Sequence, residues 1–123
     1  MEEINRVSEA IIGAAVEVHR ILGPGLLEAT YEAALCIECD DRNLKHRRQH
    51  PLPLTYKDRR IGEYRLDLLV EDAIIVEIKS VSRFDPVFAA QVLTYLRASS
   101  KQVGLLINFN SRRLTDGIKR FIL

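Results

Sequence analysis

The sequence predicts an α/β or α+β domain in which helices flank a central mixed β-sheet. Three observations support this prediction. Apolar residues recur at three- and four-residue steps near the start of the chain and after residue 85, as in amphipathic helices. Alternating and continuous apolar runs between residues 61 and 109 are typical of strands. The 123 residues are 47% hydrophobic and 28% charged, so we expect one globular domain over residues 1–123.

Two helices are expected in the first third of the chain. The segment LGPGL, residues 22–26, ends the first helix, because Pro24 cannot continue the helical ladder and the glycines permit unusual backbone angles. A second helix is expected from about Leu26 to Arg42, where polar residues end it. The apolar stripe of the first helix consists of Ile4, Val7, Ile11, Ala14, Val18 and Leu22.

Three strands should follow. Residues 47–56 alternate in polarity but contain Pro51 and Pro53, so this segment is an edge strand or irregular, because proline cannot donate to a strand ladder. Residues 61–70 alternate cleanly. A tight turn at residues 71–72 connects them to residues 73–80, which predicts an antiparallel hairpin.

The remaining elements complete the predicted order ααβββαβα. Residues 85–99 read as a helix with Asp85 as N-cap and Pro86 in the first turn. Residues 103–109 are nearly all apolar, as in a strand that is buried on both faces. We expect the last residues, 111–123, to form a short helix.

Charged residues interrupt the apolar strands of the predicted hairpin. Burying an unpaired charge is costly, so Asp67 and Glu77 are expected to be paired, to bind a metal or to belong to a site. Aligning the apolar faces of the two strands brings both carboxylates together on the opposite face. Two such groups repel each other unless a proton or a cation joins them, and their oxygens suit Mg²⁺ or Mn²⁺. The apolar faces that we align carry Leu66, Leu68, Val76 and Ile78.

Lys79 is expected on the same strand face as Glu77, where its charge suits a scissile phosphate. The lysine could also orient or help to deprotonate an attacking water. This layout fits in-line hydrolysis of a phosphodiester. The spacing alone fits equally well a structural pair of an acid and a lysine on an exposed sheet face, because short motifs match by chance.

These motifs resemble the PD-(D/E)XK nuclease superfamily. Within GLLEATY, the residues Gly25, Glu28 and Tyr31 match the signature of the GxxExxY protein family, which is assigned to that superfamily. The likeness runs from about Val18 to Phe109. Arg65-Leu66-Asp67 stands where the superfamily name has Pro-Asp, a common variation. The resemblance implies a restriction-endonuclease-like core.

The resemblance also implies roles for individual residues. Asp67 and Glu77 would bind the metal, with the carbonyl oxygen of Ile78 as a further ligand. Lys79 would position water and phosphate. Glu28 would be the helical acid that completes the metal shell, often through water, although without the family it reads as a solvated helix residue.

Other aromatic and polar residues on the helices have two readings. Gln91 and Tyr95 are four residues apart and share a helix face. They resemble the Gln-x-x-x-Tyr element of exonuclease-like branches of the superfamily, and they fit equally well a helix flank packed by a tyrosine. We expect Tyr31 to be a core aromatic residue. For His19 we favour an interaction at the helix C-terminus over a metal role.

The charge distribution bears on the partner. Net charge is +1, yet basic residues gather at 45–50, 57–60 and 111–113, in segments that also read as solvated loops. Phosphate contacts are expected at Arg47, Arg48, Arg59 and Arg60.

Cysteine usage and hydropathy bear on the setting of the chain. The CIEC segment, residues 36–39, lacks zinc-finger spacing and reads as plain helix. No apolar run approaches the roughly 18 residues of a membrane span, and the N-terminus does not resemble a signal peptide. We therefore expect a cytoplasmic protein.

We expect a small Mg²⁺- or Mn²⁺-dependent nuclease that acts on DNA, and small enzymes of this fold class often act as dimers. The alternative from another class is a non-catalytic module on the same fold that binds nucleic acid or docks a protein partner, because fold alone never fixes function. A third reading is a metal-dependent enzyme that acts on small phosphodiesters or nucleotides.

Overall fold

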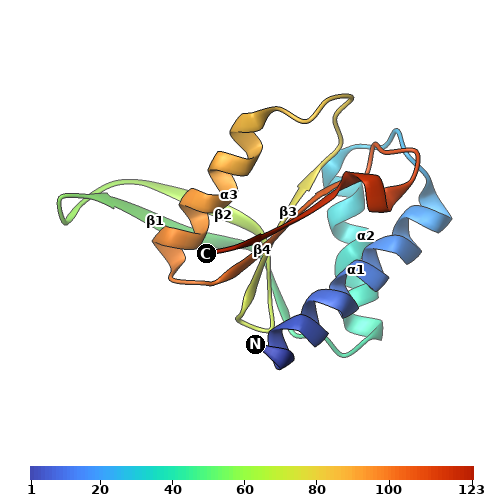
Figure 1. Ribbon diagram of the computed structural model, residues 1–123, viewed down its shortest axis with the longest axis horizontal. Helices are drawn as coiled ribbons and strands as arrows, with labels where there is room; N and C mark the ends of the chain where they lie inside the picture. The colour runs from blue at the N-terminus through green and yellow to red at the C-terminus, as the bar shows by residue number, and fades with distance from the viewer.

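A five-stranded mixed sheet organises the chain, and the computed structural model describes all residues from 1 to 123 (Figure 1). The strand order is β1-β2-β3-β4-β5; β3 and β4 are parallel, and the other neighbours are antiparallel. This architecture is α+β and agrees with the restriction-endonuclease-like core that the sequence predicted. The elements are α1 (Glu2–Leu22), α2 (Glu28–Asp41), β1 (His46–Tyr56), β2 (Arg59–Val70), β3 (Ile74–Lys79), α3 (Pro86–Ser99), β4 (Val103–Asn108), the 3₁₀ turn η1 (Leu114–Gly117) and β5 (Ile118–Ile122).

Two hydrophobic clusters hold the layers together. Helices α1 and α2 cover one face of the sheet, and α3 covers the other (Figure 1). The larger cluster joins α1 and α2 to one face of β2, β3 and β4, and includes Ile11, Leu35 and Val76. The smaller cluster joins α3 to the opposite face and includes Leu96 and Ile75. Strands β3 and β4 are thus covered on both faces, as expected for near-continuous apolar runs. None of the helices combines the length and apolar character that a membrane span requires.

Local sequence signals explain most element boundaries. The side chain of Asp85 caps α3 by accepting a hydrogen bond of 2.9 Å from the Val87 N–H. Glu71 and Asp72, with φ of 53° and 52°, form the tight turn between β2 and β3. Strand β1 lies at the edge of the sheet, where proline, which has no backbone N–H to donate, is tolerated.

The C-terminal segment differs from the predicted helix. Residues 111–117 make only the short η1 turn, and Ile118–Ile122 then form β5, which pairs antiparallel with β4. The free edge of β4 offers this segment a complete ladder, which a single helical turn cannot match. Gly117 permits the close approach, because a Cβ there would lie 2.2 Å from Ser111 Oγ and 2.6 Å from the Asn108 carbonyl oxygen.

Tyr31 fixes the connection between α1 and α2. Its side chain is fully buried, and its ring stacks on Phe109 with centroids 4.6 Å apart, so the prediction of a core aromatic residue is confirmed. Its hydroxyl donates to the Gly23 carbonyl oxygen at 2.5 Å and accepts from the Leu26 N–H at 3.1 Å. Gly23 and Gly25 both have positive φ, of 69° and 100°, and allow the chain to turn around this hydroxyl.

We predict that Tyr31→Phe lowers the free energy of unfolding by about 1–2 kcal/mol, because two backbone groups lose their shared partner. Urea denaturation monitored by circular dichroism measures this change. Tyr56→Phe is the matched control, because Tyr56 is 62% exposed. Equal midpoints for Tyr31→Phe and the wild type would contradict this role of the hydroxyl.

Candidate active site

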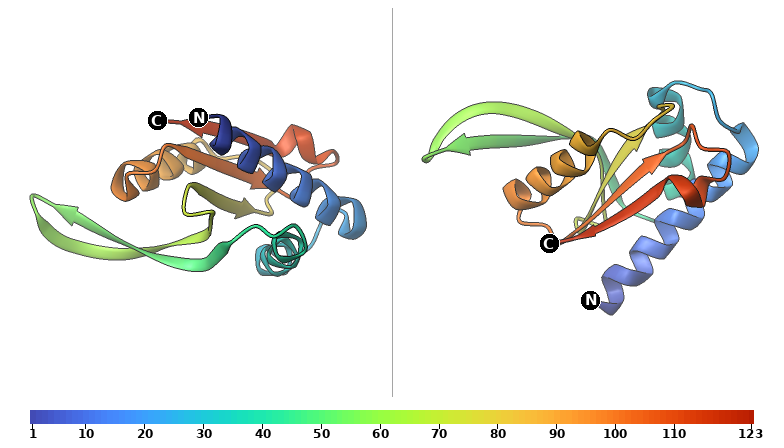
Figure 2. Two further views of the ribbon diagram at one scale, coloured as in Figure 1. Left: turned by 90° about the horizontal axis from the view of Figure 1, so that it is seen from below. Right: turned by 45° about the horizontal axis from the view of Figure 1, so that its top comes forward.

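Strands β2 and β3 part after only three paired positions. The ladder runs from Val70 opposite Ile74 to Leu68 opposite Val76 and stops there. Beyond this point, β1 and β2 continue together as a long hairpin that curves away from the sheet and passes alongside α3 (Figure 2). Asp67 and Glu77 are the next residues in register, so they stand where the two strands separate.

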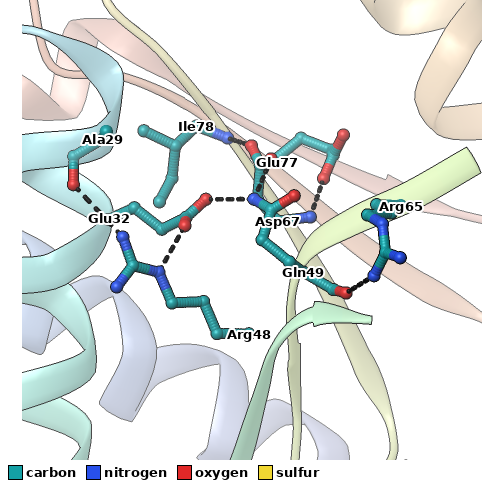
Figure 3. Close-up of polar contacts among 8 residues, drawn as sticks. All are labelled: Ala29, Glu32, Arg48, Gln49, Arg65, Asp67, Glu77 and Ile78. Carbon is teal, nitrogen blue, oxygen red and sulfur yellow. Dashed lines mark hydrogen bonds and ion pairs between the residues drawn. The ribbon is translucent and has the colours of Figure 1, made fainter. Parts of the chain in front are cut away.

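Reciprocal hydrogen bonds close this opening (Figure 3). The backbone N–H of Asp67 donates to Glu77 Oε2 at 2.8 Å, and the backbone N–H of Ile78 donates to Asp67 Oδ2, also at 2.8 Å. Each carboxylate therefore satisfies a backbone donor on the opposite strand, as a ladder carbonyl would. The proximity of the two acids that the strand alignment predicted is confirmed, and neither carboxylate can move away without exposing an unpaired N–H.

The face assignment in β2 was wrong for Tyr64 and Leu66, which precede Asp67 and lie on the α3 side of the sheet. We aligned Leu66 with Leu68, but Leu66 packs in the α3 cluster, whereas Leu68 packs against α1 and α2. The pairing of β1 with β2 skips Gln49 and Asp67, and Gln49 has a φ of 53°. This irregularity interrupts the alternation of side chains, which periodicity alone cannot reveal.

The two carboxyl groups have raised pKa values. Burial, together with the negative charge of Asp67, raises the pKa of Glu77 from 4.5 to about 8, against the hydrogen bond from the Asp67 N–H, which lowers it. Burial likewise raises the pKa of Asp67, with Glu32 as a second source of repulsion, against the hydrogen bond from the Ile78 N–H. Lys79 lowers both pKa values. At neutral pH the pair is therefore suited to hold a proton or a cation between its oxygens.

Glu32 and Gln49 belong to this site, although the sequence did not single them out. The Gln49 Nε2 donates to Glu32 Oε1 at 2.9 Å and to Asp67 Oδ1 at 3.4 Å, so its amide bridges two carboxylates (Figure 3). Arg48 Nε donates to Glu32 Oε2 at 2.5 Å. One signal was available: the spacing to Leu35 and Cys39 places Glu32 on the buried stripe of α2. The bend at Gln49 left no trace in the sequence.

Glu28 lies one helical turn before Glu32, at the exposed start of α2. The Leu26 carbonyl oxygen, just before this turn, accepts a hydrogen bond of 2.6 Å from Ser80 Oγ. Ser80 follows Lys79, so the start of α2 lies beside the end of β3. Glu28 therefore lies on the side of the molecule where β3 ends. Glu32 is the helical acid that is joined to Asp67 through Gln49.

Lys79 and residues of α3 lie near the two carboxylates, on the sheet face that α3 covers. The Lys79 ammonium lies 4.5 Å from the centroid of the Phe88 ring, on the sheet face that α3 covers. Tyr95 is only 4% exposed. Burial and the negative charge of Glu77 together raise the pKa of its phenol to about 12, against the Gln91 side chain, which lowers it. Gln91 and Tyr95 thus adjoin the site along one face of α3.

The four arginines that were assigned to phosphate contacts fall into two groups. Arg47 and Arg48 lie at the base of the β1–β2 hairpin, and Arg59 and Arg60 at its tip. Arg48 is engaged by Glu32, and Arg60 forms an ion pair with Glu63. Arg47 and Arg59 are exposed.

The other singled-out polar residues have structural surroundings. Cys36 and Cys39 both lie on α2, as predicted, and burial raises the pKa of Cys39 to about 11. His19 lies in the last turn of α1, as expected, and its Nε2 lies 2.7 Å from the Ser111 carbonyl oxygen.

The donor set fits a hydrated hard cation. No group of three or more His, Cys, Asp or Glu side chains forms a ready-made cage. The pair of Asp67 and Glu77 nevertheless provides carboxylate oxygens, the ligand type that Mg²⁺ and Mn²⁺ prefer. Mg²⁺ usually keeps several waters and takes only one or two protein carboxylates, and these two residues match that donor set.

A family model described as the PD-(D/E)XK nuclease superfamily matches residues 5–121. Comparisons with curated proteins and with solved structures give no match. The matched range contains both carboxylates, the lysine, and the α2 and α3 residues described above.

We predict that the metal-free protein loses stability as pH rises from about 4.5 through about 8, the ordinary and the folded-state pKa of Glu77. In this window the folded state retains a proton that the unfolded chain has released, so the free energy of unfolding falls by up to about 1.4 kcal/mol per pH unit. Glu77→Gln should flatten this dependence, and Glu9→Gln on the exposed face of α1 should not. Urea midpoints across the pH range, with chelator present, provide the test. Parallel curves for wild type and Glu77→Gln would contradict the raised pKa.

Proposed function

The chain belongs to the PD-(D/E)XK nuclease superfamily, and from this we propose that it is a nuclease that hydrolyses phosphodiester bonds in DNA with Mg²⁺ or Mn²⁺ as cofactor. The observation that carries the proposal is the pair of half-buried Asp67 and buried Glu77 where β2 and β3 separate, with Lys79 on the same strand face as Glu77. The Gly25-Glu28-Tyr31 signature supports an assignment to the GxxExxY family within the superfamily.

The residues of the site divide the work among them. Asp67 and Glu77 would hold the cation, with the Ile78 carbonyl oxygen as a further ligand. When bound there, the cation would supply Lewis acidity at the scissile phosphate and lower the pKa of water. Lys79, held against Phe88, places its charge beside a non-bridging phosphate oxygen and orients the attacking water.

Residues on the helices support this centre. Glu28 accepts a hydrogen bond from water at the edge of the metal shell, since it is exposed at the start of α2. Gln91 and Tyr95 steady the substrate and the acids from α3. Tyr95 does so as a neutral phenol, because its pKa is raised to about 12.

The β1–β2 hairpin provides the phosphate contacts. Residues 45–65 contain seven Lys and Arg against two Asp and Glu, whereas the whole chain has a net charge of +1. From the position of Gln49 to the tip, the hairpin is roughly 20 Å long at about 3.3 Å per residue. Arg59 and Arg60 at the tip therefore reach phosphates several nucleotides away from the scissile bond, while Arg47 contacts phosphates near its base.

We predict that Asp67→Asn and Lys79→Met each lower metal-dependent DNA cleavage by at least about 100-fold, since each removes a charge that acts on the reacting phosphate. Cleavage of labelled single- and double-stranded DNA with Mg²⁺ or Mn²⁺ is the measurement. Lys119→Met is the matched control for the lysine, because Lys119 also rests on a phenylalanine, 5.3 Å from the Phe84 ring centroid. Undiminished cleavage by Asp67→Asn or Lys79→Met would refute the site. If the proteins bind DNA and none of them, the wild type included, cleaves it, a non-catalytic binding module would be favoured.

A second prediction separates the two helical acids. Glu28→Gln should lower cleavage about 10- to 100-fold, as loss of a group outside the metal ligands does, and leave the unfolding midpoint unchanged. Glu32→Gln should lower the unfolding midpoint, because it weakens the partner of Arg48. Thermal unfolding and cleavage rates are measured for both variants. Wild-type cleavage by Glu28→Gln would remove Glu28 from the site and leave Glu32 as the helical acid.

A further inference from the structure

A cleft of about 290 Å³ opens between α3 and the β1–β2 hairpin, beside the proposed catalytic centre. Leu54 and Tyr64 line it from the hairpin, and Ala90, Gln91 and Thr94 line it from α3. Most of its lining is apolar, yet it lies against the most basic part of the chain. An apolar partner alone would leave that charge unused, so the surroundings call for an anionic ligand with an apolar part.

Tyr64 gives the cleft an aromatic surface. The residue is 48% exposed, so its ring is accessible to a ligand and is not buried in the core. Its ring centroid lies 6.1 Å from that of Tyr95, with the planes inclined by 54°, so Tyr95 supports it from beneath. A half-exposed tyrosine that is held in place by a buried one is suited to stack against a flat ring.

Helix α3 connects the cleft to the catalytic centre. Phe88 and Gln91 are three residues apart and therefore share a face of the helix. The Lys79 ammonium lies over the Phe88 ring. Gln91 lines the cleft as well, so the cleft begins within one helical turn of Phe88 and of the Lys79 ammonium that lies over its ring. The Gln91 amide has both donors and acceptors, and it can bond the edge of a heterocycle whose phosphate lies at Lys79.

We propose that this cleft is a subsite for one unpaired nucleobase of a single-stranded stretch of the substrate, stacked on Tyr64. The inference rests on the proposed nuclease function and specifies its substrate. A base in a duplex is stacked on both faces and paired along one edge, so it cannot enter such a cleft. A base in a single strand can enter it at little cost. The volume is sufficient for one base. The basic hairpin then follows the backbone of the same strand.

The test uses a single-stranded DNA oligonucleotide that contains one 2-aminopurine, a fluorescent base that is quenched when it stacks. It is titrated with the full-length protein in the presence of chelator, so that no cleavage occurs. We expect quenching by the wild type and by Tyr64→Phe. Tyr64→Leu should lose the quenching and bind roughly 5- to 100-fold more weakly, the range for loss of one stacked base.

Two further variants control for loss of folding and for general contacts between the DNA and the β1–β2 hairpin. Ala90→Leu fills the cleft from an exposed helix position and should abolish quenching with Tyr64 in place. Tyr56→Leu removes a tyrosine outside the cleft that is more exposed than Tyr64, and should quench like the wild type. Quenching that survives in both Tyr64→Leu and Ala90→Leu, or that is lost equally in Tyr56→Leu, overturns the subsite. Equal quenching of the same base within a duplex does so too.

Cleavage assays on the same proteins separate the two proposals. Metal-dependent cleavage by the wild type without Tyr64-dependent quenching would remove the subsite and leave the nuclease. Tyr64-dependent quenching without cleavage under any metal would support the subsite as a base-binding site and remove the nuclease.

Discussion

The reciprocal hydrogen bonds between Asp67 and Glu77 and the opposite backbones are the interaction on which the rest of this structure depends. They allow β2 and β3 to part after Leu68 without leaving backbone donors unsatisfied. Because the strands part here, the β1–β2 hairpin can leave the sheet and run beside α3, which creates the cleft at Tyr64. The same bonds hold two acids close together at the point where the sheet opens.

A purely structural reason for these acids is hard to reconcile with their energetics. Burial and mutual repulsion raise the pKa of Glu77 to about 8, so near neutral pH the metal-free fold has to keep a proton that the unfolded chain has released, which lowers its stability. An apolar pair of similar volume is often as stable as a buried polar one or more so, and retained buried acids cluster at functional sites. A bound cation resolves the conflict, because it neutralises both carboxylates where they already are. Lys79, Glu32 and the Gln49 amide then complete the polar surroundings.

The sequence predicted those features that repeat along the chain or follow local turn chemistry. The helices, the Asp85 cap, the turn after Val70 and the pairing of the two acids all arise from short-range patterns. The last element was wrong because Ile118–Ile122 form a strand only through the distant edge of β4. Leu66 was assigned to the wrong face because the backbone bends at Gln49, whose φ is positive without a glycine to mark it. Glu28 was singled out by the family signature, whereas Glu32 could have been noticed only through its helical spacing to Leu35 and Cys39.

The most direct test of a metal-dependent centre is isothermal titration of Mn²⁺ into the wild-type protein and into Asp67→Asn at a fixed pH near 8, where ionisation of Glu77 is no longer limiting. Asp116→Asn, a substitution of an exposed acid on η1, serves as the control. Our account predicts saturable binding to the wild type and to the control, and its loss in Asp67→Asn. Equal binding by all three proteins, or no binding to the wild type even with DNA present, would contradict a metal centre at the parting of β2 and β3.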